Sequence, residues 1–321
     1  MAKIIRITDT NGNSVEFEDE VKASGGMKDA YFSPKRDYVV LFFRDKPKPG
    51  QRDRLEKITD QYRRSIFEQE GGDYLKKLYC WPYAVVEHEG RLGVVAPFYD
   101  SAFFFKHGSV NNDSLGIKGK DKEGKWFTSA RLRKRSVDPR ELGDYSTHIK
   151  LCLQLARSVH RMHAAGLAHS DLSYKNVLVD PSSGRACMID IDGLVVPGKF
   201  PPEVIGTPDF IAPEVIKTQH LPHQDPNRKL PSRQTDLHAL AVLVYMYLLY
   251  RHPLKGSKFH HEDTQTDLIL SMGEKALFIE HPGDPSNRVK TADLDEKEMP
   301  WADTTKIPYS VTGPYLSELF L

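Results

Sequence analysis

The octet "HSDLSYKN" at residues 169–176 decides how the rest of the sequence is interpreted. It places Asp171 five residues before Asn176, after an apolar helical stretch and before a strand-like run. A carboxylate can accept a proton from an attacking hydroxyl group, and an amide oxygen can be a ligand of a metal ion that carries phosphate. Because Asp and Asn are also common in turns, the surrounding sequence must support this chemistry.

Composition excludes several classes of protein. The chain has 321 residues with 45 Lys+Arg against 44 Asp+Glu, so no strong net charge predicts binding to nucleic acid or an anionic membrane. Its longest apolar run, residues 239–250, is too short to span a bilayer. The stretch "MAKIIRITDT" has no long apolar core, so we do not expect export, and the three cysteines show no metal-binding or disulfide spacing. We expect a globular protein of the cytoplasm.

The first hundred residues predict a sheet with one helical interruption. Six short runs are rich in β-branched and aromatic residues and are bounded by turn residues; they are residues 3–9, 14–21, 29–34, 37–45, 83–90 and 91–99. Between them, residues 50–79 have helical spacing, with Leu55, Ile58, Tyr62 and Ile66 on one face. The Gly71-Gly72 pair is expected to break this helix.

The remainder predicts a helical part. Residues 106–144 are polar and basic, which indicates a surface insertion. A helix is expected over 145–166, with Ser146 or Thr147 as its N-cap and Gly166 as its stop. A hairpin and a second apolar helix at 235–254 follow. The prediction is an α+β fold of two lobes with a cleft between them, a β-rich lobe at 1–99 and a helical lobe at 100–321.

Five short motifs occur in order along the chain. They are "ASGGMKDAYF" (23–32), "GLAHSDLSYKNVLVD" (166–180), "CMIDIDGL" (187–194), "GTPDFIAPE" (206–214) and "TDLHALAVLVYMYLL" (235–249). In this order they resemble the glycine-rich loop, catalytic loop, metal-binding segment, Ala-Pro-Glu motif and following buried helix of protein kinases. The resemblance covers roughly residues 15–260, and its first motif is the weakest.

The resemblance implies a role for each matched residue. Asp171 would orient or deprotonate the accepting hydroxyl, while Asn176 and Asp190 would hold Mg²⁺ on ATP. His169 and Asp236 would support the loop, and Thr207 would bond Asp171. The nucleotide-binding candidates implied in this way are Gly25, Gly26, Lys28, Ala96, Phe98 and Leu178, with backbone from Ala96 to Phe98 meeting adenine. Asp192 is an alternative metal ligand, but a solvated turn residue is the preferred interpretation.

The chain departs from the family where a lysine is expected on the third strand of the sheet. The strand "DYVVLFFRD" (37–45) has no lysine, and the family position falls on Phe42 or a neighbour. In the with-no-lysine kinases, which this front end resembles, the lysine comes from the glycine-rich strand. Lys28 has that offset, with Arg44 as an alternative, and its flexible stem suits a displaced role. The carboxylate partner stays open among Glu68, Glu70 and Asp73.

Other departures concern regulation and substrate. Ser170 replaces the arginine that reads a phosphorylated activation loop in many kinases, and Thr207 is the only hydroxyl residue between Asp190 and Glu214. Both features predict activity that is independent of activation-loop phosphorylation. Ser173 stands where serine/threonine kinases keep a lysine, as in small-molecule phosphotransferases, whereas "GTPDFIAPE" resembles a protein-substrate platform.

Two further segments allow alternatives. "SARLRKR" (129–135) is either a docking patch for acidic partners or, preferably, a solvated hairpin. The ending "GPYLSELFL" (313–321) looks like a cut before further helices, similar to bacterial kinases with a helix-hairpin-helix tail. If it is natural, Arg288 is a candidate partner for Glu214.

The sequence therefore predicts an ATP- and Mg²⁺-dependent serine/threonine protein kinase that also phosphorylates itself. Its partners would be protein substrates, without a membrane and without nucleic acid, and its oligomeric state is open. Two alternatives remain: a pseudokinase scaffold, because the third-strand lysine is missing, and a small-molecule phosphotransferase, because of Ser173.

Overall fold

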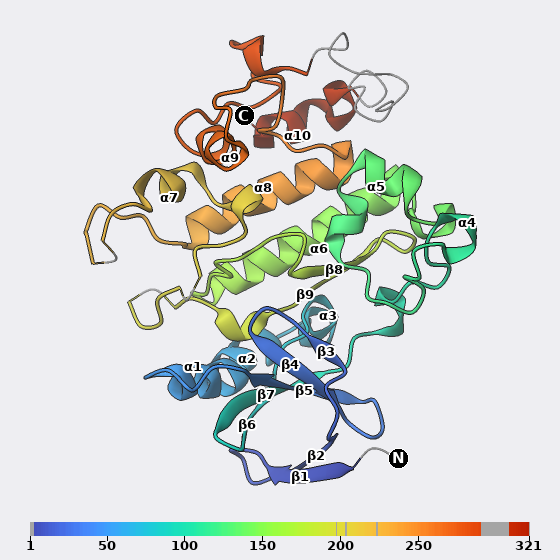
Figure 1. The fold of residues 1–321 in the computed structure, drawn as a ribbon, viewed down its shortest axis with the longest axis vertical. Coiled ribbons are helices and arrows are strands. Elements are labelled where there is room, and N and C mark those ends of the chain that lie inside the picture. Colours follow the sequence, from blue (N-terminus) through green and yellow to red (C-terminus); the bar gives the residue numbers. More distant parts are fainter. Residues whose placement is uncertain (1–2, 197, 203, 223, 290–307, 321) are drawn as a thin grey trace.

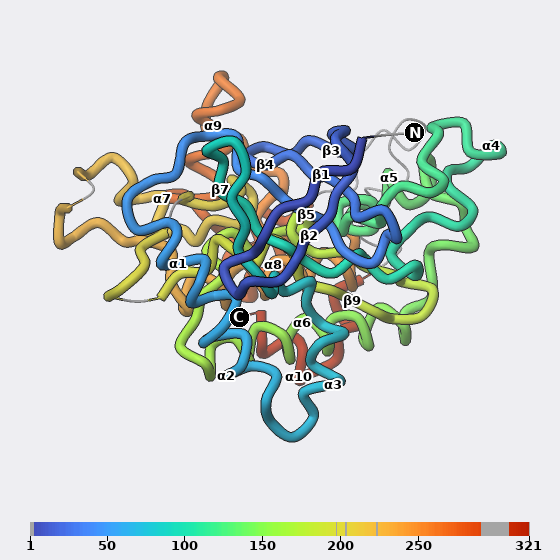
Figure 2. Tube along the Cα trace, turned by 90° about the horizontal axis from the view of Figure 1, so that it is seen from below, coloured from blue at the N-terminus to red at the C-terminus, as the bar shows by residue number. Residues whose placement is uncertain are grey.

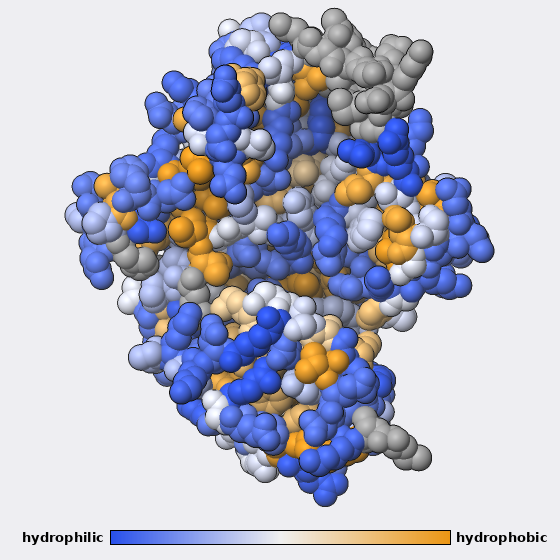
Figure 3. Space-filling model, in the orientation of Figure 1, coloured by the Kyte–Doolittle hydropathy of each residue, from blue (hydrophilic) through white to orange (hydrophobic). Residues whose placement is uncertain are grey.

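The computed structural model describes residues 3–196, 198–202, 204–222, 224–289 and 308–320. It divides into a strand-rich N-terminal part and a helical C-terminal part (Figure 1). Hydrophilic residues cover most of both parts on the face shown in Figure 3. None of the described helices is both long and apolar enough to cross a membrane.

The N-terminal part is built on a five-stranded antiparallel sheet of order β3-β4-β5-β7-β6. The strands are β3 (Ala23–Ser24), β4 (Lys28–Phe32), β5 (Tyr38–Phe43), β6 (Ala84–His88) and β7 (Arg91–Pro97). A separate hairpin, β1 (Ile4–Thr8) and β2 (Ser14–Glu18), completes this part. All six predicted strand runs therefore contain a strand.

Alternation along β5 divides its side chains between two environments. Val40 and Phe42 are buried together with Val15 and Phe17 of the β1–β2 hairpin. Val39, Leu41 and Phe43 have the opposite orientation and line a cavity between the sheet and the helical part. The hairpin thus covers one face of the sheet, and the other face is left for the site.

The helical interruption forms as predicted, with a widened turn. It consists of α1 (Gln51–Lys57), the π-helical turn η1 (Ile58–Tyr62) and α2 (Arg63–Phe67). Leu55, Ile58 and Ile66 are buried. The chain breaks at Gly71, whose φ of 78° is the left-handed conformation that glycine adopts easily. The short α3 (Gly72–Leu75) and η2 (Lys76–Leu78) follow.

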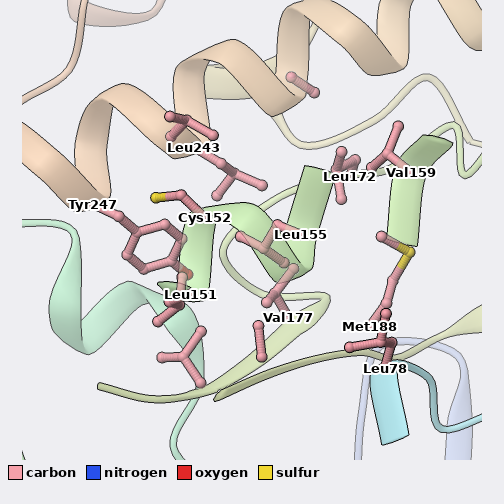
Figure 4. Packing of buried hydrophobic residues seen from close by; sticks show 14 of the residues in the cluster. Leu78, Leu151, Cys152, Leu155, Val159, Leu172, Val177, Met188, Leu243 and Tyr247 are labelled. Atoms are coloured by element: carbon pink, nitrogen blue, oxygen red, sulfur yellow. The ribbon is translucent and has the colours of Figure 1, made fainter. Parts of the chain in front are cut away.

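The helical part is centred on α6 (Tyr145–Ala164) and α8 (Arg233–Leu249), which lie against each other. Figure 4 shows Cys152 of α6 near Leu243 of α8, Leu151 near the Tyr247 ring, and Leu155 near Val177. On the other side of α6 lies the hairpin of β8 (Val177–Asp180) and β9 (Arg185–Met188). The loop 169–176 precedes β8 and Asp190 follows β9, so both lie at the open end of this hairpin, where Val177 pairs with Met188.

The ends of α6 test the predicted capping residues. Gly166 stops the helix with a φ of 81°, as expected. The N-cap is Asp144, not Ser146 or Thr147. The Asp144 carboxylate accepts a hydrogen bond from the Thr147 backbone N–H, and the Thr147 hydroxyl oxygen accepts one from the Asp144 N–H. Thr147 is therefore the reciprocal member of a capping box that begins one turn earlier.

The segment 101–144, which includes the expected surface insertion 106–144, is part of the main core. It contains η3 (Ser101–Phe103), α4 (Val110–Asp113), η4 (Gly124–Phe127), α5 (Ala130–Arg135) and η5 (Pro139–Glu141). Its residues Phe105, Ile117, Phe127 and Val137 are all buried in the same cluster as α6 and α8. The prediction of a surface insertion over 106–144 was wrong, because these isolated apolar residues show no regular spacing.

The basic stretch 129–135 is also not a hairpin, since most of it forms α5. The guanidinium of Arg133 lies 4.0 Å from the centre of the Tyr250 ring, an inward packing contact. Seen from the strand-rich end in Figure 2, α1 lies on one side of the molecule and α4 and α5 on the other.

The remaining described elements follow the hairpin. They are η6 (Ile191–Gly193), η7 (Pro208–Phe210), α7 (Pro213–Thr218), α9 (Thr264–Met272), η8 (Pro285–Asn287), η10 (Tyr309–Thr312) and α10 (Gly313–Phe320). Leu316 and Phe320 of α10 pack against the main core.

Candidate active site

A cavity of about 520 Å³ lies between the sheet and the helical part. Both parts supply its lining residues, which include Gly25, Gly26, Lys28, Val39, Leu41, Ala96 and Tyr99 from one side and Asp171, Asn176, Asp190, Asp192 and Thr207 from the other. Its size is within the range of small-molecule sites. The structure thus brings most of the sequence-predicted site residues into one cavity.

Asp236 holds the loop 169–176 from beneath. Its buried carboxylate accepts hydrogen bonds from the backbone N–H groups of His169 at 2.7 Å and Ser170 at 3.0 Å. Ser170 has a φ of 66°, an uncommon conformation for a residue with a side chain. An ionised acceptor makes stronger hydrogen bonds than a neutral one, so Asp236 stabilises this strained turn.

His169 ties the loop to the segment that carries Asp190. Its Nε2 lies 3.0 Å from the carbonyl oxygen of Ile189. The neighbouring Ile189 N–H donates to the carbonyl oxygen of Asn176. These contacts fix the relative position of the two segments, which is the support expected of His169.

The side chains of Asn176 and Thr207 both donate hydrogen bonds to Asp171. The Asn176 amide donates to the backbone oxygen of Asp171 at 2.8 Å and to its Oδ2 at 3.0 Å. The Thr207 hydroxyl donates to Asp171 Oδ1 at 2.9 Å, as predicted, and lies 3.3 Å from Ser173 Oγ. Both carboxylate oxygens of Asp171 are therefore held in place at the cavity wall.

The side-chain oxygen of Asn176 remains available as a ligand for a cation. Because the Asn176 amide nitrogen is turned toward Asp171, its oxygen has no hydrogen-bond partner within the described ranges. Together with the half-exposed Asp190 carboxylate it forms an oxygen donor set, which suits Mg²⁺. The described residues contain no group of three or more His, Cys, Asp or Glu that could hold a metal alone. The residues fit a metal that keeps phosphate oxygens in its shell.

Lys28 enters the cavity from β4 and meets two carboxylates. Its Nζ lies 2.6 Å from Asp190 Oδ1 and 2.8 Å from each carboxylate oxygen of Asp192. Burial alone would lower the pKa of Lys28, but the charges of Asp192 and Asp190 outweigh it and raise that pKa above its usual value. Burial would likewise raise the pKa of Asp190, and the Lys28 ammonium instead holds it below its usual value.

Asp192 contradicts the preferred interpretation as a solvated turn residue. Its side chain is only 6% exposed, compared with 45% for Asp190. In the sequence, the spacing of Asp190 and Asp192 in "DIDG" was a signal that both carboxylates could reach the cavity. The pairing could not be predicted, because it depends on Lys28 from a distant strand.

On the strand that lacks a lysine, the structure favours a neighbour of Phe42 over Phe42 itself, because Leu41 and Phe43 both line the cavity. Phe42 points away from the cavity into the β1–β2 hairpin, whereas Leu41 faces the cavity. Lys28 is paired with Phe43 across the β4–β5 register, and its Nζ lies 5.5 Å from the Phe43 ring centre. The ammonium thus comes from the neighbouring strand and lies beside the cavity face of β5.

The alternative cation and the helical carboxylates lie elsewhere. Arg44 bonds Asp29 Oδ1 at 2.9 Å and does not line the cavity. Glu68, Glu70 and Asp73 line a separate surface depression next to Phe67. The residues of α1 at the cavity are Gln51, Arg54 and Leu55, so these three acidic candidates for the Lys28 partner were wrong.

The predicted nucleotide-binding residues are only partly brought together. Ala96 lines the cavity, but Phe98 does not, and its N–H already donates to the Asp37 carbonyl. Leu178 is also outside the lining, because it packs with Phe103 and Cys187 behind the cavity wall. The sequence missed Cys80 and Tyr99, which belong to that wall. Tyr99 directly follows the predicted strand, which was the available signal.

The suggested partner of Glu214 was also wrong. Arg288 Nε lies 3.8 Å from Glu280, which also pairs with Arg251 at 3.0 Å. Glu214 is exposed and makes no ion pair in the part of the chain that the structure describes.

The segment between Asp190 and Thr207 is held against α1. Arg54 Nη2 donates to the Pro201 carbonyl at 2.6 Å. The guanidinium of Arg54 and the ammonium of Lys57 lie 5.5 and 5.6 Å from the centre of the buried Phe200 ring. Cation–π contacts and a hydrogen bond therefore fix this segment without a phosphate group.

Comparisons with known sequences agree with the motifs. A family model described as protein kinase domain matches residues 127–293. A dual serine/threonine and tyrosine protein kinase of Apis mellifera is 28% identical over 134 residues, which are 41% of this chain and 12% of that protein. A serine/threonine-protein kinase of Chlamydia felis is 26% identical over 169 residues, 44% of this chain and 17% of the relative. The chain spans less than a fifth of these relatives' length.

Among solved structures, the Toxoplasma gondii specific rhoptry antigen kinase domain is similar to this chain. The TM-score is 0.50 at 13% identity, over 95% of this chain and 88% of that chain. Such a likeness shows the fold. It confirms the predicted α+β architecture with a strand-rich N-terminal part and a helical C-terminal part.

Proposed function

Because this chain belongs to the protein kinase family, we propose that it transfers the terminal phosphoryl group of ATP to serine or threonine side chains of proteins, including its own. The observation that carries the proposal is that Lys28, Asp190, Asn176 and Asp171 line one cavity although β5 lacks a lysine. Phosphoryl transfer requires a cation, two oxygen ligands for a metal ion, and a carboxylate near the acceptor hydroxyl.

Each residue has a distinct task in this proposal. Asp171 orients the accepting hydroxyl group and takes its proton, with its carboxylate fixed by Asn176 and Thr207. Asn176 and Asp190 hold Mg²⁺, which neutralises charge on the phosphates when it is bound. Lys28 places its ammonium against the same phosphates.

The serine/threonine preference rests on two observations. Thr207 bonds Asp171 at the wall that an acceptor hydroxyl must approach. Relatives of the chain include proteins named serine/threonine-protein kinases. We further propose that the protein works in the cytoplasm on protein partners, as its composition predicts.

The test compares phosphate transfer by three variants. The purified chain is incubated with labelled ATP, Mg²⁺ and a general acceptor protein, and labelled phosphoserine and phosphothreonine are quantified. We expect Asp171→Asn and Lys28→Met to lower transfer by roughly 10²-fold or more. Asp73→Asn is the matched control, because it removes a carboxylate that is 94% exposed and lies outside the cavity. It should transfer at the wild-type rate.

Two outcomes would replace the proposal by its alternatives. Wild-type protein that binds ATP but labels neither itself nor any acceptor protein would be a scaffold. Transfer to metabolites in a small-molecule screen, with none to protein, would indicate a small-molecule phosphotransferase, an alternative favoured by Ser173 in place of a lysine.

We also propose that activity does not require phosphorylation of the segment between Asp190 and Glu214. The contacts of Arg54 with Pro201 and Phe200 support this, as does the absence of hydroxyl residues other than Thr207 in that segment. Treatment with a protein phosphatase should leave the initial rate unchanged, and Thr207→Glu should not raise it. A severalfold loss after dephosphorylation would contradict this proposal.

A further inference from the structure

Lys28 is held more completely by Asp192 than by the predicted metal ligand. Both carboxylate oxygens of Asp192 lie 2.8 Å from Lys28 Nζ, whereas Asp190 contributes one oxygen at 2.6 Å. Asp192 is almost fully buried, and Asp190 is half-exposed toward the cavity. Both carboxylates contact the same ammonium, but only Asp190 has an exposed side that a ligand in the cavity can also contact.

Helix α1 offers no carboxylate for this ammonium. Asp53 pairs with Lys57 at 2.5 Å, Glu56 with Arg52 at 3.8 Å and, in the adjoining η1 turn, Asp60 with Arg64 at 2.6 Å. These three acidic side chains are exposed and are absent from the cavity lining. The described carboxylates that contact Lys28 both come from the segment after β9.

The backbone at Asp192 is fixed by its neighbours. Asp192 lies inside the 3-10 turn η6, and Ile191 beside it is buried in the main core. Val195, just beyond the turn, exchanges backbone hydrogen bonds with Ala168 next to the loop 169–176. A buried anion on such a turn can restrain the long and flexible lysine stem.

We propose that Asp192 is the positioning residue of Lys28 and replaces the helix carboxylate that fixes the phosphate-binding lysine in other kinases. This inference rests on the proposed function. Asp190 stays available to a cation on its exposed side, while Asp192 keeps Lys28 in place. The placement of Lys28 then depends on the segment after β9 and is independent of a shift of helix α1.

The first test measures thermal unfolding and needs no phosphate transfer. The melting temperatures of wild type, Lys28→Met, Asp192→Asn and the double variant form a double-mutant cycle. Lys28→Met leaves two carboxylates without their ammonium, so removing Asp192 as well should recover stability. We expect the double variant to melt about 2–6 °C above the sum of the single effects. Additive effects would overturn the inference.

A matched control uses a carboxylate of helix α1. Asp53→Asn combined with Lys28→Met should show additive melting temperatures, because Asp53 pairs with Lys57 on the surface. Coupling of the same size as for Asp192 would mean that the cycle reports general charge effects. That result would also overturn the assignment.

The second test repeats the cycle on transfer kinetics. Asp192→Asn should lower kcat/KM for ATP by about 10²-fold in the wild-type background, because Lys28 is displaced. It should cause almost no further loss in Lys28→Met protein. Asp190→Asn, by contrast, should still lower kcat/KM in that background. A persistent effect of Asp192→Asn there would show a role that does not act through Lys28, against the inference.

The two proposals fail in different ways. Absence of phosphate transfer by wild type, with thermal coupling between Lys28 and Asp192 intact, would overturn the proposed function and leave the pairing assignment standing. Normal transfer without thermal or kinetic coupling would overturn the role of Asp192 alone.

Discussion

Replacing Lys122 should destabilise this fold, because its ammonium group is buried between two carboxylates. Its Nζ lies 2.8 Å from Glu141 and 2.7 Å from Asp180, and the three side chains are 4%, 2% and 7% exposed. Lys122→Met keeps the apolar stem but leaves two buried carboxylates without a cation. Breaking a buried pair in this way costs about 3–5 kcal/mol, so we expect unfolding free energy to fall by that amount.

Urea denaturation followed by circular dichroism at pH 7.5 measures this loss. Arg140→Met is the matched control, because the Arg140–Asp138 pair lies in the same segment but its arginine is largely exposed. Such surface pairs contribute about 0–1 kcal/mol. If Lys122→Met cost no more than Arg140→Met, the reasoning that Lys122 joins residues 100–144 to the end of β8 would be refuted.

Three further predictions concern single groups. Asp236→Asn should lower the free energy of unfolding by about 2–3 kcal/mol, because the backbone N–H groups of Ser170 and His169 lose an ionised acceptor. Urea denaturation measures this loss, and an unchanged denaturation midpoint would contradict the prediction. Burial raises the pKa of Cys80 to about 12, so iodoacetamide should modify it about 100-fold more slowly than a free thiol at pH 7.5. Mass spectrometry measures the rate of modification, and equal rates for the two thiols would disprove the effect of burial. Burial lowers the pKa of His148 to about 4, so on acidification the unfolded chain binds a proton before the folded chain does. The free energy of unfolding should therefore fall between pH 6.5 and 4 by up to about 1 kcal/mol per pH unit. This slope should be shallower in His148→Asn, and an identical slope would show that His148 does not cause it.

The sheet and the main helices could be predicted because their apolar residues are periodic. Alternation defines β5, and one helical face carries Leu55, Ile58 and Ile66. The exception is the segment 100–144, whose buried Phe105 and Ile117 are separated by charged residues without a period. Such residues are buried by packing with elements distant in sequence, among them β8, so local patterns predicted a solvated surface over 106–144.

The candidate site was predictable where chain order alone specifies it. Asp171, Asn176, Asp190 and Asp236 occur in motifs, and the structure brings them to the expected places. Details that depend on register or on packing across the cavity were not predictable. A shift of one residue on a strand reverses the face, so the choice between Phe42 and its neighbours Leu41 and Phe43, which line the cavity, needed the structure.

The buried anchors of residues 100–144 also affect how proteases would act on the folded chain. The stretch carries many lysine and arginine side chains, which are the cleavage signals of trypsin. Digestion needs a backbone that can detach and extend into the protease, and four core side chains together with the Lys122 pair oppose that detachment. Native digestion should therefore begin elsewhere, and this basic stretch should stay intact until the main core itself opens.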